Sequence, residues 1–221
     1  MTLRELSDEF QRRFDAKSAA REKALVAARR SIRCSANAIR AIHRGELDQA
    51  NELMAESRRH VEAGRDAVRD EHPDVHFAGF LQDAQKEYAE ARLTEAIVTG
   101  AALPSPDDLG VELAPYLKGM SEAIGEGRRA ILDLLRAGQV ETSERILTLM
   151  EDMYYVLVCM DYPDAITSNL RRSTDVARAI IEKTRGDLSM SLVQRDLRLA
   201  LEGHAGRLGP AAKNPADPNG T

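Results

Sequence analysis

The stretch AREKALVAARRSIRCSANAIRAIHRG, residues 20–45, decides the fold class of this chain. Small and apolar residues recur in it at alternating steps of three and four, which places their side chains along one face of an α-helix. They are Leu25, Ala28, Ile32, Ser35, Ile39 and Ile42. Gly45 follows the last of them and fits a helix C-terminus. We therefore predict one long helix from about Leu3 to His43.

The rest of the chain favours the same kind of structure. Aromatic residues make up only 4% of the sequence and Trp is absent, whereas Ala, Leu, Arg and Glu, all strong helix formers, are abundant. Breaks at Gly and Pro separate further helical segments, which we place at about 47–69, 75–98, 115–137, 140–160 and 163–201. The prediction is an all-α bundle of about six to seven helices in one domain, residues 1–202, followed by a disordered Gly/Pro/Asn-rich tail, residues 203–221.

The cysteines and the hydropathy pattern bear on where the protein works. Cys34 and Cys159 form no CxxC pair and no zinc-binding pattern, so we expect buried free thiols in a reducing compartment. No apolar run reaches the roughly 20 residues that a membrane-spanning helix needs. The sequence thus predicts a cytoplasmic protein with no membrane contact.

Charge is distributed unevenly along the chain. The formal net charge of −5 argues against nucleic-acid binding by the protein as a whole. Residues 12–44, however, hold ten Lys or Arg and only two acids, a local balance of +8. A basic helix on an acidic body can still bind phosphate groups locally.

One predicted helix carries three acids on a single face. The segment DAQKEYAEA places Asp83, Glu87 and Glu90 at steps of four and three. Such a stripe can be an ordinary solvated face, and Lys86, four residues before Glu90, could pair with it. It can also be one wall of an oxygen-rich pocket for a divalent cation.

A second pair of acids lies in a helix that is otherwise apolar. In ILTLMEDMYYVLVCM, residues 146–160, only Glu151 and Asp152 interrupt the apolar sequence, and a helix apolar on all sides is usually buried. A buried carboxylate is costly unless it is paired or binds a metal, so an ion pair with an Arg of a neighbouring helix is one alternative. The other is that this helix meets the Glu87/Glu90 helix, and the three acids together hold Mg²⁺ or Mn²⁺. Nucleotide-binding, zinc-protease and serine-hydrolase motifs are absent.

At these residues the sequence resembles the translin/Trax family. EYAEA, residues 87–91, is similar to a glutamate motif of Trax, and residues 20–45 resemble the first helix of that protein. Similar stretches follow in family order, namely SRRHV (57–61), PYLKGMSEAIGEGRR (115–129), ILTLMEDMYYVL (146–157) and SNLRRSTDVARAIIEKTRGDL (168–188). The order and spacing of these motifs carry the resemblance, which covers residues 21–188.

The resemblance implies a function and a set of site residues. It implies a translin-like fold, binding of single-stranded RNA or DNA, a homo-oligomeric octamer-like shell, and Mg²⁺- or Mn²⁺-dependent endoribonuclease activity. Glu87, Glu90 and Asp152 carry over as catalytic and metal-binding acids, with Glu126 as a fourth metal acid. The loop at residues 101–111 is shorter than in animal Trax, which favours a self-assembling protein without a separate partner subunit.

The basic segment then gains an expected role. Arg21, Lys23, Arg29, Arg30 and Arg33 would contact phosphates, and with so few aromatic residues binding would depend on the nucleic-acid backbone rather than on base stacking. Two alternatives stay open. One is a translin-type binding protein without catalysis, in which the acids form salt bridges. The other is a purely structural helical scaffold, in which the basic residues only solvate a helix or pair between subunits.

Overall fold

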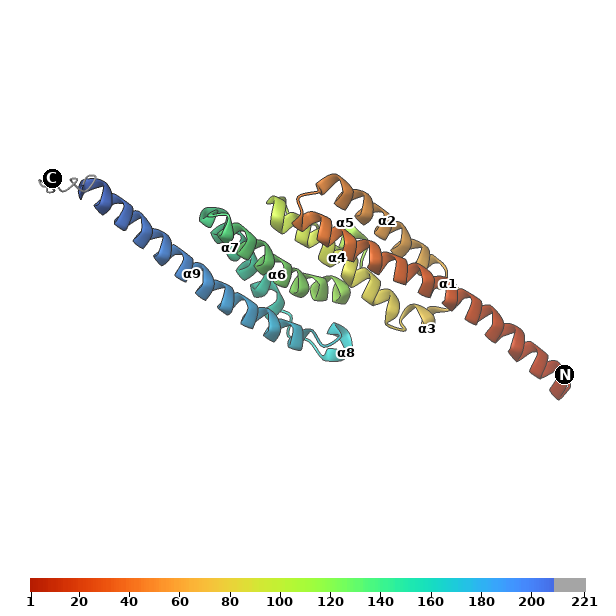
Figure 1. The fold of residues 1–221 in the computed structure, drawn as a ribbon. Coiled ribbons are helices and arrows are strands. Elements are labelled where there is room, and N and C mark those ends of the chain that lie inside the picture. Colours follow the sequence, from red (N-terminus) through yellow and green to blue (C-terminus); the bar gives the residue numbers. More distant parts are fainter. Residues whose placement is uncertain (209–221) are drawn as a thin grey trace, which may run out of the picture.

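In the computed structural model, which describes residues 1–208, and side chains through residue 204, the chain is entirely helical where it has regular structure. The predicted all-α class is therefore confirmed for this part of the chain (Figure 1). Within residues 1–208 there are six long helices and three helical segments of a single turn. The long helices are α1 (Leu3–His43), α2 (Leu47–Asp66), α4 (Phe80–Thr99), α6 (Leu113–Arg136), α7 (Val140–Val158) and α9 (Leu170–Leu208), and the turns are α3 (Pro73–His76), α5 (Pro106–Leu109) and α8 (Asp164–Thr167).

Two of the predicted helices are interrupted by residues with positive φ. The third splits into α3 and α4 because Gly79, at φ 96°, turns the chain immediately before α4. The sixth splits into α8 and α9 at Ser168 and Asn169, whose φ angles are 54° and 64°. Helix α9 then continues through Leu208, six residues beyond the expected end of the domain. The rest of the expected tail, residues 209–221, lies outside the described residues.

The helices pack as an elongated array (Figure 1). Helix α1 lies between α2 and α4, helix α6 packs on α4, and α7 and α9 cover the other side of α6 (Figure 1). Contacts at two glycines show that α4 and α6 run side by side in one direction: Gly119 of α6 meets Lys86 of α4, and Gly127 meets Ile97. The N-terminal part of α1 and the C-terminal part of α9 project from opposite ends of the array (Figure 1).

Small buried residues let α1 approach its neighbours closely. Ala24, Ala28 and Ala38 are almost completely buried, and the hydroxyl of Ser57 on α2 lies 2.8 Å from the hydroxyls of both Ser31 and Ser35. Buried hydroxyls need partners, and these three satisfy one another between the two helices. The buried face of α1 is thus wider than the predicted seam, because α2 and α4 cover two adjacent faces of the helix.

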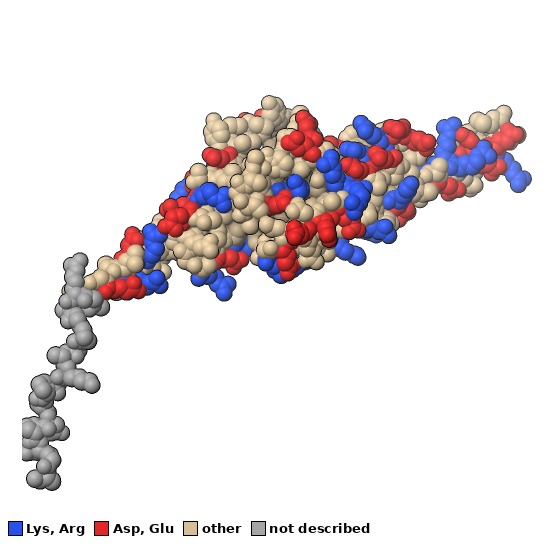
Figure 2. Space-filling view, turned by 90° about the horizontal axis from the view of Figure 1, so that it is seen from above, with Lys and Arg blue, Asp and Glu red and all other residues tan. Residues whose placement is uncertain are grey.

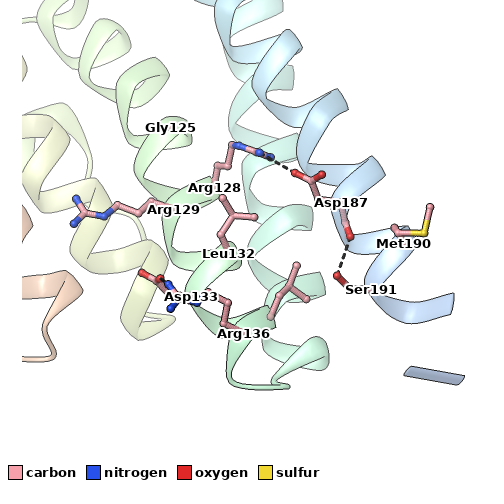
Figure 3. Close-up of a pocket in the computed structure, with 10 residues that line it drawn as sticks. Gly125, Arg128, Arg129, Leu132, Asp133, Arg136, Asp187, Met190 and Ser191 are labelled. Atoms are coloured by element: carbon pink, nitrogen blue, oxygen red, sulfur yellow. Dashed lines mark hydrogen bonds and ion pairs between the residues drawn. The ribbon is translucent and has the colours of Figure 1, made fainter. Parts of the chain in front are cut away.

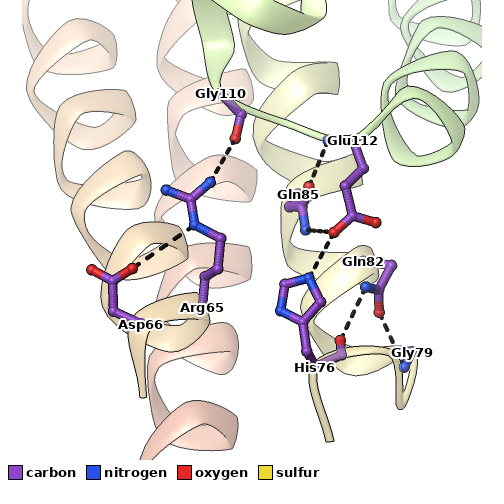
Figure 4. Close-up of polar contacts among 8 residues, drawn as sticks. All are labelled: Arg65, Asp66, His76, Gly79, Gln82, Gln85, Gly110 and Glu112. Carbon is purple, nitrogen blue, oxygen red and sulfur yellow. Dashed lines mark hydrogen bonds and ion pairs between the residues drawn. The ribbon is translucent and has the colours of Figure 1, made fainter. Parts of the chain in front are cut away.

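A polar network fixes the start of α6 against α4 (Figure 4). The side-chain oxygen of buried Gln85 accepts a hydrogen bond from the backbone N–H of Glu112 at 2.8 Å. The carboxylate of Glu112 lies 2.9 Å from Nε2 of His76 and accepts a second bond from Gln85 at 3.3 Å. Gln82 caps the same corner by bonding to His76 and Gly79. These contacts set the register of α6, on which Glu122, one of the acids described below, follows ten residues after Glu112.

The surface mixes both signs of charge. Figure 2 shows basic and acidic side chains interspersed over one face of the array. Several large apolar side chains are also exposed, among them Phe10 and Phe14 on the projecting part of α1 and Tyr155 on α7. None of the helices in the described part of the chain combines the length and the apolar character that crossing a membrane requires.

Candidate metal centre between α4 and α6

Three carboxylates from two helices meet where α6 crosses close to α4. Glu87 and Glu90 on α4 and Glu122 on α6 each offer one oxygen atom, and these atoms lie within 4.8 Å of one another. The spacing of three residues places Glu87 and Glu90 on the same face of α4. Glu90 is buried, while Glu87 and Glu122 are partly exposed. The pair Glu87 and Glu90 was expected at such a site, whereas Glu122 was not.

The electrostatics of Glu90 show that negative charge is in excess in the cluster. Burial, followed by the nearby carboxylates of Glu122 and Glu87, raises the pKa of Glu90 to about 8. Lys86 acts in the opposite direction, and Glu126 adds a smaller upward contribution. At pH 7 the carboxyl group of Glu90 is therefore mostly protonated, and a cation bound beside it would displace the proton.

Lys86 provides the ammonium group of the cluster. Its Nζ lies 2.5 Å from Glu122 and 2.9 Å from Glu87, so it bridges the two helices. Burial alone would lower the pKa of Lys86, but these two carboxylates hold it above its ordinary value. The sequence suggested Glu90 as the partner of Lys86; the structure gives it Glu87 and Glu122 instead.

Glu126 lies beside the three acids but has its own partner. Its Oε2 is 2.5 Å from Nε2 of His43, at the end of α1, and 3.7 Å from the guanidinium of Arg129. The hydrogen bond to His43 is the largest influence that holds the pKa of Glu126 below its usual range. Glu126 therefore stays ionised at the edge of the cluster and connects α6 to α1.

Asp152 is not part of this cluster. It is exposed on α7, on a stripe that also exposes Tyr155, Val156 and Cys159. The expectation that this acid meets Glu87 fails geometrically because α7 was taken to be buried on all sides, whereas one of its faces is open. Its neighbour Glu151 pairs at 2.7 Å with Arg185 of α9, which was the alternative considered from the sequence, although the pair lies at the surface and not in the interior. Cys159, expected to be buried, is likewise exposed; Cys34 is buried.

The close approach of α6 to α4 depends on Gly119. A Cβ atom at this position would lie 2.7 Å from the backbone oxygen of Lys86 and 3.0 Å from the backbone nitrogen of Glu90. Glu122 is one helical turn further along, so the same contact brings its carboxylate to Glu87 and Glu90. The sequence did contain a signal for Glu122, since GMSEAIGEG repeats an acid at a step of four, Glu122 and Glu126, after a glycine.

The predicted phosphate-binding residues lie along α1. Arg21 pairs with its neighbour Glu22 at 2.6 Å. Lys23, Arg29, Arg30 and Arg33 are exposed and enter no ion pair with any other described residue. Arg29 and Arg33 share one side of α1 with Arg40 and with His43, which contacts Glu126. A basic stripe on α1 therefore ends at the edge of the acid cluster.

A separate groove lies between α6 and α9 (Figure 3). Arg128, Arg129 and Arg136 line it, but each has an acidic partner. Arg128 bonds to Asp187 at 2.7 Å, and Arg136 lies 3.8 Å from Asp133. In Figure 3, Arg129 points away from Asp187, towards the side of α4. The acids beside these guanidinium groups offset most of their positive charge, so the groove is less basic than the exposed stripe on α1, and we do not place the functional site there.

The acid cluster suits a hard divalent cation. Its ligand atoms are all carboxylate oxygens, which Mg²⁺ and Mn²⁺ prefer, and they come from two helices that pack closely at Gly119. Burial first, and then the like charges of Glu122 and Glu87, raise the pKa of Glu90, and a cation would offset both of these costs of ionisation. The fold and this cluster together define an all-helical bundle with a carboxylate site on one face.

Comparison with known proteins gives the family. A structure of AfC3PO in complex with duplex RNA matches with a TM-score of 0.77 and 32% identity over 85% of this chain and 97% of that one. A crystal structure of AfC3PO alone matches with a TM-score of 0.78 at the same identity and coverage. The chain belongs to the translin/Trax family, among its C3PO-like members, as the motifs predicted.

Two other matches extend this relationship. The crystal structure of apo-NeC3PO, 21% identical with a TM-score of 0.73, shares the fold. Among sequences, uncharacterized protein MJ0175 of Methanocaldococcus jannaschii is 30% identical over 188 residues, which are 82% of this chain and 81% of that protein. No family model matches the chain.

Proposed function

We propose that this protein is a Mg²⁺- or Mn²⁺-dependent endoribonuclease that cuts single-stranded RNA at the cluster of Glu87, Glu90 and Glu122. The observation that carries the proposal is the meeting of these three carboxylates within 4.8 Å, with Glu90 buried. The relationship to AfC3PO, whose structure includes duplex RNA, supports RNA as the ligand class.

Each side chain has a role in the proposal. Glu87, Glu90 and Glu122 would hold the cation, which would supply positive charge to stabilise a phosphoryl oxygen and would lower the pKa of water. Lys86 keeps the carboxylates of Glu87 and Glu122 together and neutralises part of their charge. Glu126, which the hydrogen bond to His43 keeps ionised, is the fourth acid and lies at the edge of the cluster. Asp152 drops out of the set because it lies on another face.

The RNA would reach the cluster along α1. The exposed Lys23, Arg29, Arg30 and Arg33 have their ammonium and guanidinium groups free for phosphates. Because His43 at the end of α1 touches Glu126, a strand bound along α1 would be led to the acids. Few aromatic residues are available for stacking, so binding should weaken steeply with added salt.

Assembly of several copies belongs to the same proposal. Tyr155, Val156 and Val158 expose apolar surface on α7, as do Phe10 and Phe14 on the projecting end of α1. Such exposed apolar surface on a helical protein is typical of sites of contact with another protein. A homo-oligomeric shell, as the family resemblance implies, would cover these residues and enclose the basic helix and the acids. Light scattering of the purified protein measures the number of copies directly.

The test is cleavage of a labelled single-stranded RNA, with a duplex of the same sequence in parallel. We expect cleavage with Mg²⁺ or Mn²⁺ and none with a chelator. The Glu87→Gln/Glu90→Gln double variant should cut at least about 100-fold more slowly, because it loses two of the three metal ligands. That loss corresponds to about 2.8 kcal/mol of barrier. RNA binding by the double variant should persist, because the basic residues are unchanged.

The outcomes separate this proposal from its alternatives. If the double variant cuts as fast as the parent, the acid cluster is not the active site. Salt-dependent RNA binding without cleavage under either metal would instead favour a binding protein of the translin kind. Preferential cleavage of the duplex would overturn the single-strand preference but leave the site intact.

A further inference from the structure

A second cluster of ligand-type side chains lies between α1 and α2, away from the carboxylates. The Sγ atom of Cys34 on α1 and one atom each from Glu56 and His60 on α2 lie within 4.8 Å of one another. Nothing in the proposed nuclease mechanism uses these residues. Cys34 is buried, His60 is partly buried and Glu56 is exposed, so the cluster lies at the edge of the protein interior.

We propose that Cys34, Glu56 and His60 form a binding site for a borderline-soft divalent cation, Zn²⁺ in the first place, independent of the carboxylate site between α4 and α6. A thiolate, an imidazole and a carboxylate are all ligands that Zn²⁺ accepts. The sulfur and nitrogen donors favour Zn²⁺ over Mg²⁺, which prefers oxygen.

The geometry is close to what such an ion needs. Glu56 and His60 are four residues apart on α2, so both side chains project from the same face. Nε2 of His60 and Oε1 of Glu56 are 3.4 Å apart. Two ligands of one tetrahedral zinc ion are separated by roughly 3.3–3.8 Å, because each lies about 2.0–2.3 Å from the metal. The Sγ atom of Cys34 lies within 4.8 Å of one ligand atom each of Glu56 and His60, so it is near enough to be the third ligand.

The thiol of Cys34 faces the carboxylate of Glu56, and the guanidinium groups of Arg33 and Arg59 lie nearby. As at any zinc–thiolate bond, the ion would have to replace the proton of the thiol, so its binding should weaken as the pH falls. Glu56 also lines an open recess with Glu52 and Arg59 on α2, which gives an ion a path of entry.

The bound ion would act as a crosslink. Cys34 belongs to α1 and the other two ligands to α2, so the metal would tie together the two helices beside exposed Arg30 and Arg33. With three protein ligands the fourth position of the ion would face solvent, as in zinc sites that keep an exchangeable position. The simpler alternative, a surface ion pair between Glu56 and His60, would leave Cys34 without a role.

The test is a Co²⁺ and Zn²⁺ titration of the full-length protein in excess Mg²⁺, which keeps the carboxylate cluster occupied. We expect one equivalent of Co²⁺ to give the near-ultraviolet charge-transfer absorption of a cobalt–thiolate bond, and Zn²⁺ to abolish it. The absorption should be lost in Cys34→Ser and kept in Cys159→Ser, the matched control at the exposed cysteine.

A second variant guards against misfolding of Cys34→Ser. His60→Gln changes a partly exposed side chain and should lower the Zn²⁺ affinity, measured by competition with a coloured chelator, by more than about 100-fold, beyond the usual cost of losing only an outer-shell partner. Unchanged affinity in His60→Gln, no thiolate absorption in the parent, or absorption that survives Cys34→Ser would each overturn the proposal.

Discussion

The two ligand clusters of this protein differ in chemistry although both join neighbouring helices. The cluster between α4 and α6 contains only carboxylates, has an ammonium group bridging two of them, and raises the pKa of its buried member, Glu90, to about 8. The cluster between α1 and α2 mixes a thiol, an imidazole and a carboxylate. Both clusters have three ligand residues, so it is the type of ligand atom, oxygen only or sulfur and nitrogen as well, that would give them different cation preferences.

The largest expected effect is the loss of RNA cleavage on substitution of Glu122, the acid found in the cluster, compared with substitution of Asp152, the acid predicted from the sequence. Glu122→Gln removes a carboxylate from the cluster and should lower Mg²⁺-dependent RNA cleavage by at least about 100-fold. Asp152→Asn, which changes an exposed residue on α7, should retain cleavage within about twofold. The reverse result would return Asp152 to the active site and show that the carboxylate cluster is incomplete. Initial rates on a labelled RNA measure both.

The next effect concerns the close approach that forms the cluster. In Gly119→Ala the new Cβ would meet the backbone of Lys86 at 2.7 Å and push α6 away from α4. We expect a loss of about 1–3 kcal/mol of folding free energy from overpacking, together with weaker Mg²⁺ binding. Denaturant unfolding and metal titration measure the two.

Gly125→Ala is the matched control on the same helix. Its Cβ would meet only Cδ1 of Ile180, at an ordinary 3.8 Å. Because it shares the gain in helix propensity, of about 1 kcal/mol, it should be neutral or stabilising. Equal effects of the two substitutions would show that the contact at Gly119 does not hold the cluster together.

A third, smaller effect follows from the pKa of Glu90. Below about pH 8 a cation must displace the proton of this group, so the apparent Mg²⁺ affinity should rise about tenfold per pH unit and level off above pH 8. In metal-free protein the sign is opposite. Between the ordinary value of 4.5 and about 8 the folded state holds a proton that the unfolded chain has released, so the contribution of Glu90 to stability falls as pH rises.

Glu90→Gln tests both trends at once. Without a titratable group, the pH dependence of Mg²⁺ affinity should flatten across this window, and so should the part of the stability profile due to Glu90. Calorimetric titration and thermal unfolding at several pH values provide the data. A pH dependence that is the same in parent and variant would assign it to another group.

The smallest expected effect is a null one that tests whether the clusters are independent. Cys34→Ser should leave Mg²⁺-dependent RNA cleavage within about twofold of the parent, because Mg²⁺ has little preference for sulfur and the thiol lies between other helices. A large loss of cleavage in a folded Cys34→Ser protein would mean that the two clusters are coupled. Circular dichroism confirms that the variant is folded before rates are compared.

Local features of the sequence determined much of the fold. Helix α1 begins and ends at the predicted Leu3 and His43, since apolar periodicity and Gly45 are signals that neighbouring residues carry by themselves. The interruptions at Ser168 and Asn169 were missed because non-glycine residues rarely adopt positive φ and give no local warning.

Only part of the carboxylate site could be predicted from such local features of the sequence. Glu87 and Glu90 share a helix face at a spacing of three, so the sequence alone determined that they lie together. Their third partner depended on which helix packs against α4, and that was decided by the fit of Gly119 against the backbone of α4. Tertiary packing thus chose Glu122 over Asp152 and brought Cys34 to His60, because contacts between distant segments depend on the complementary shapes of whole helices, which no local pattern records.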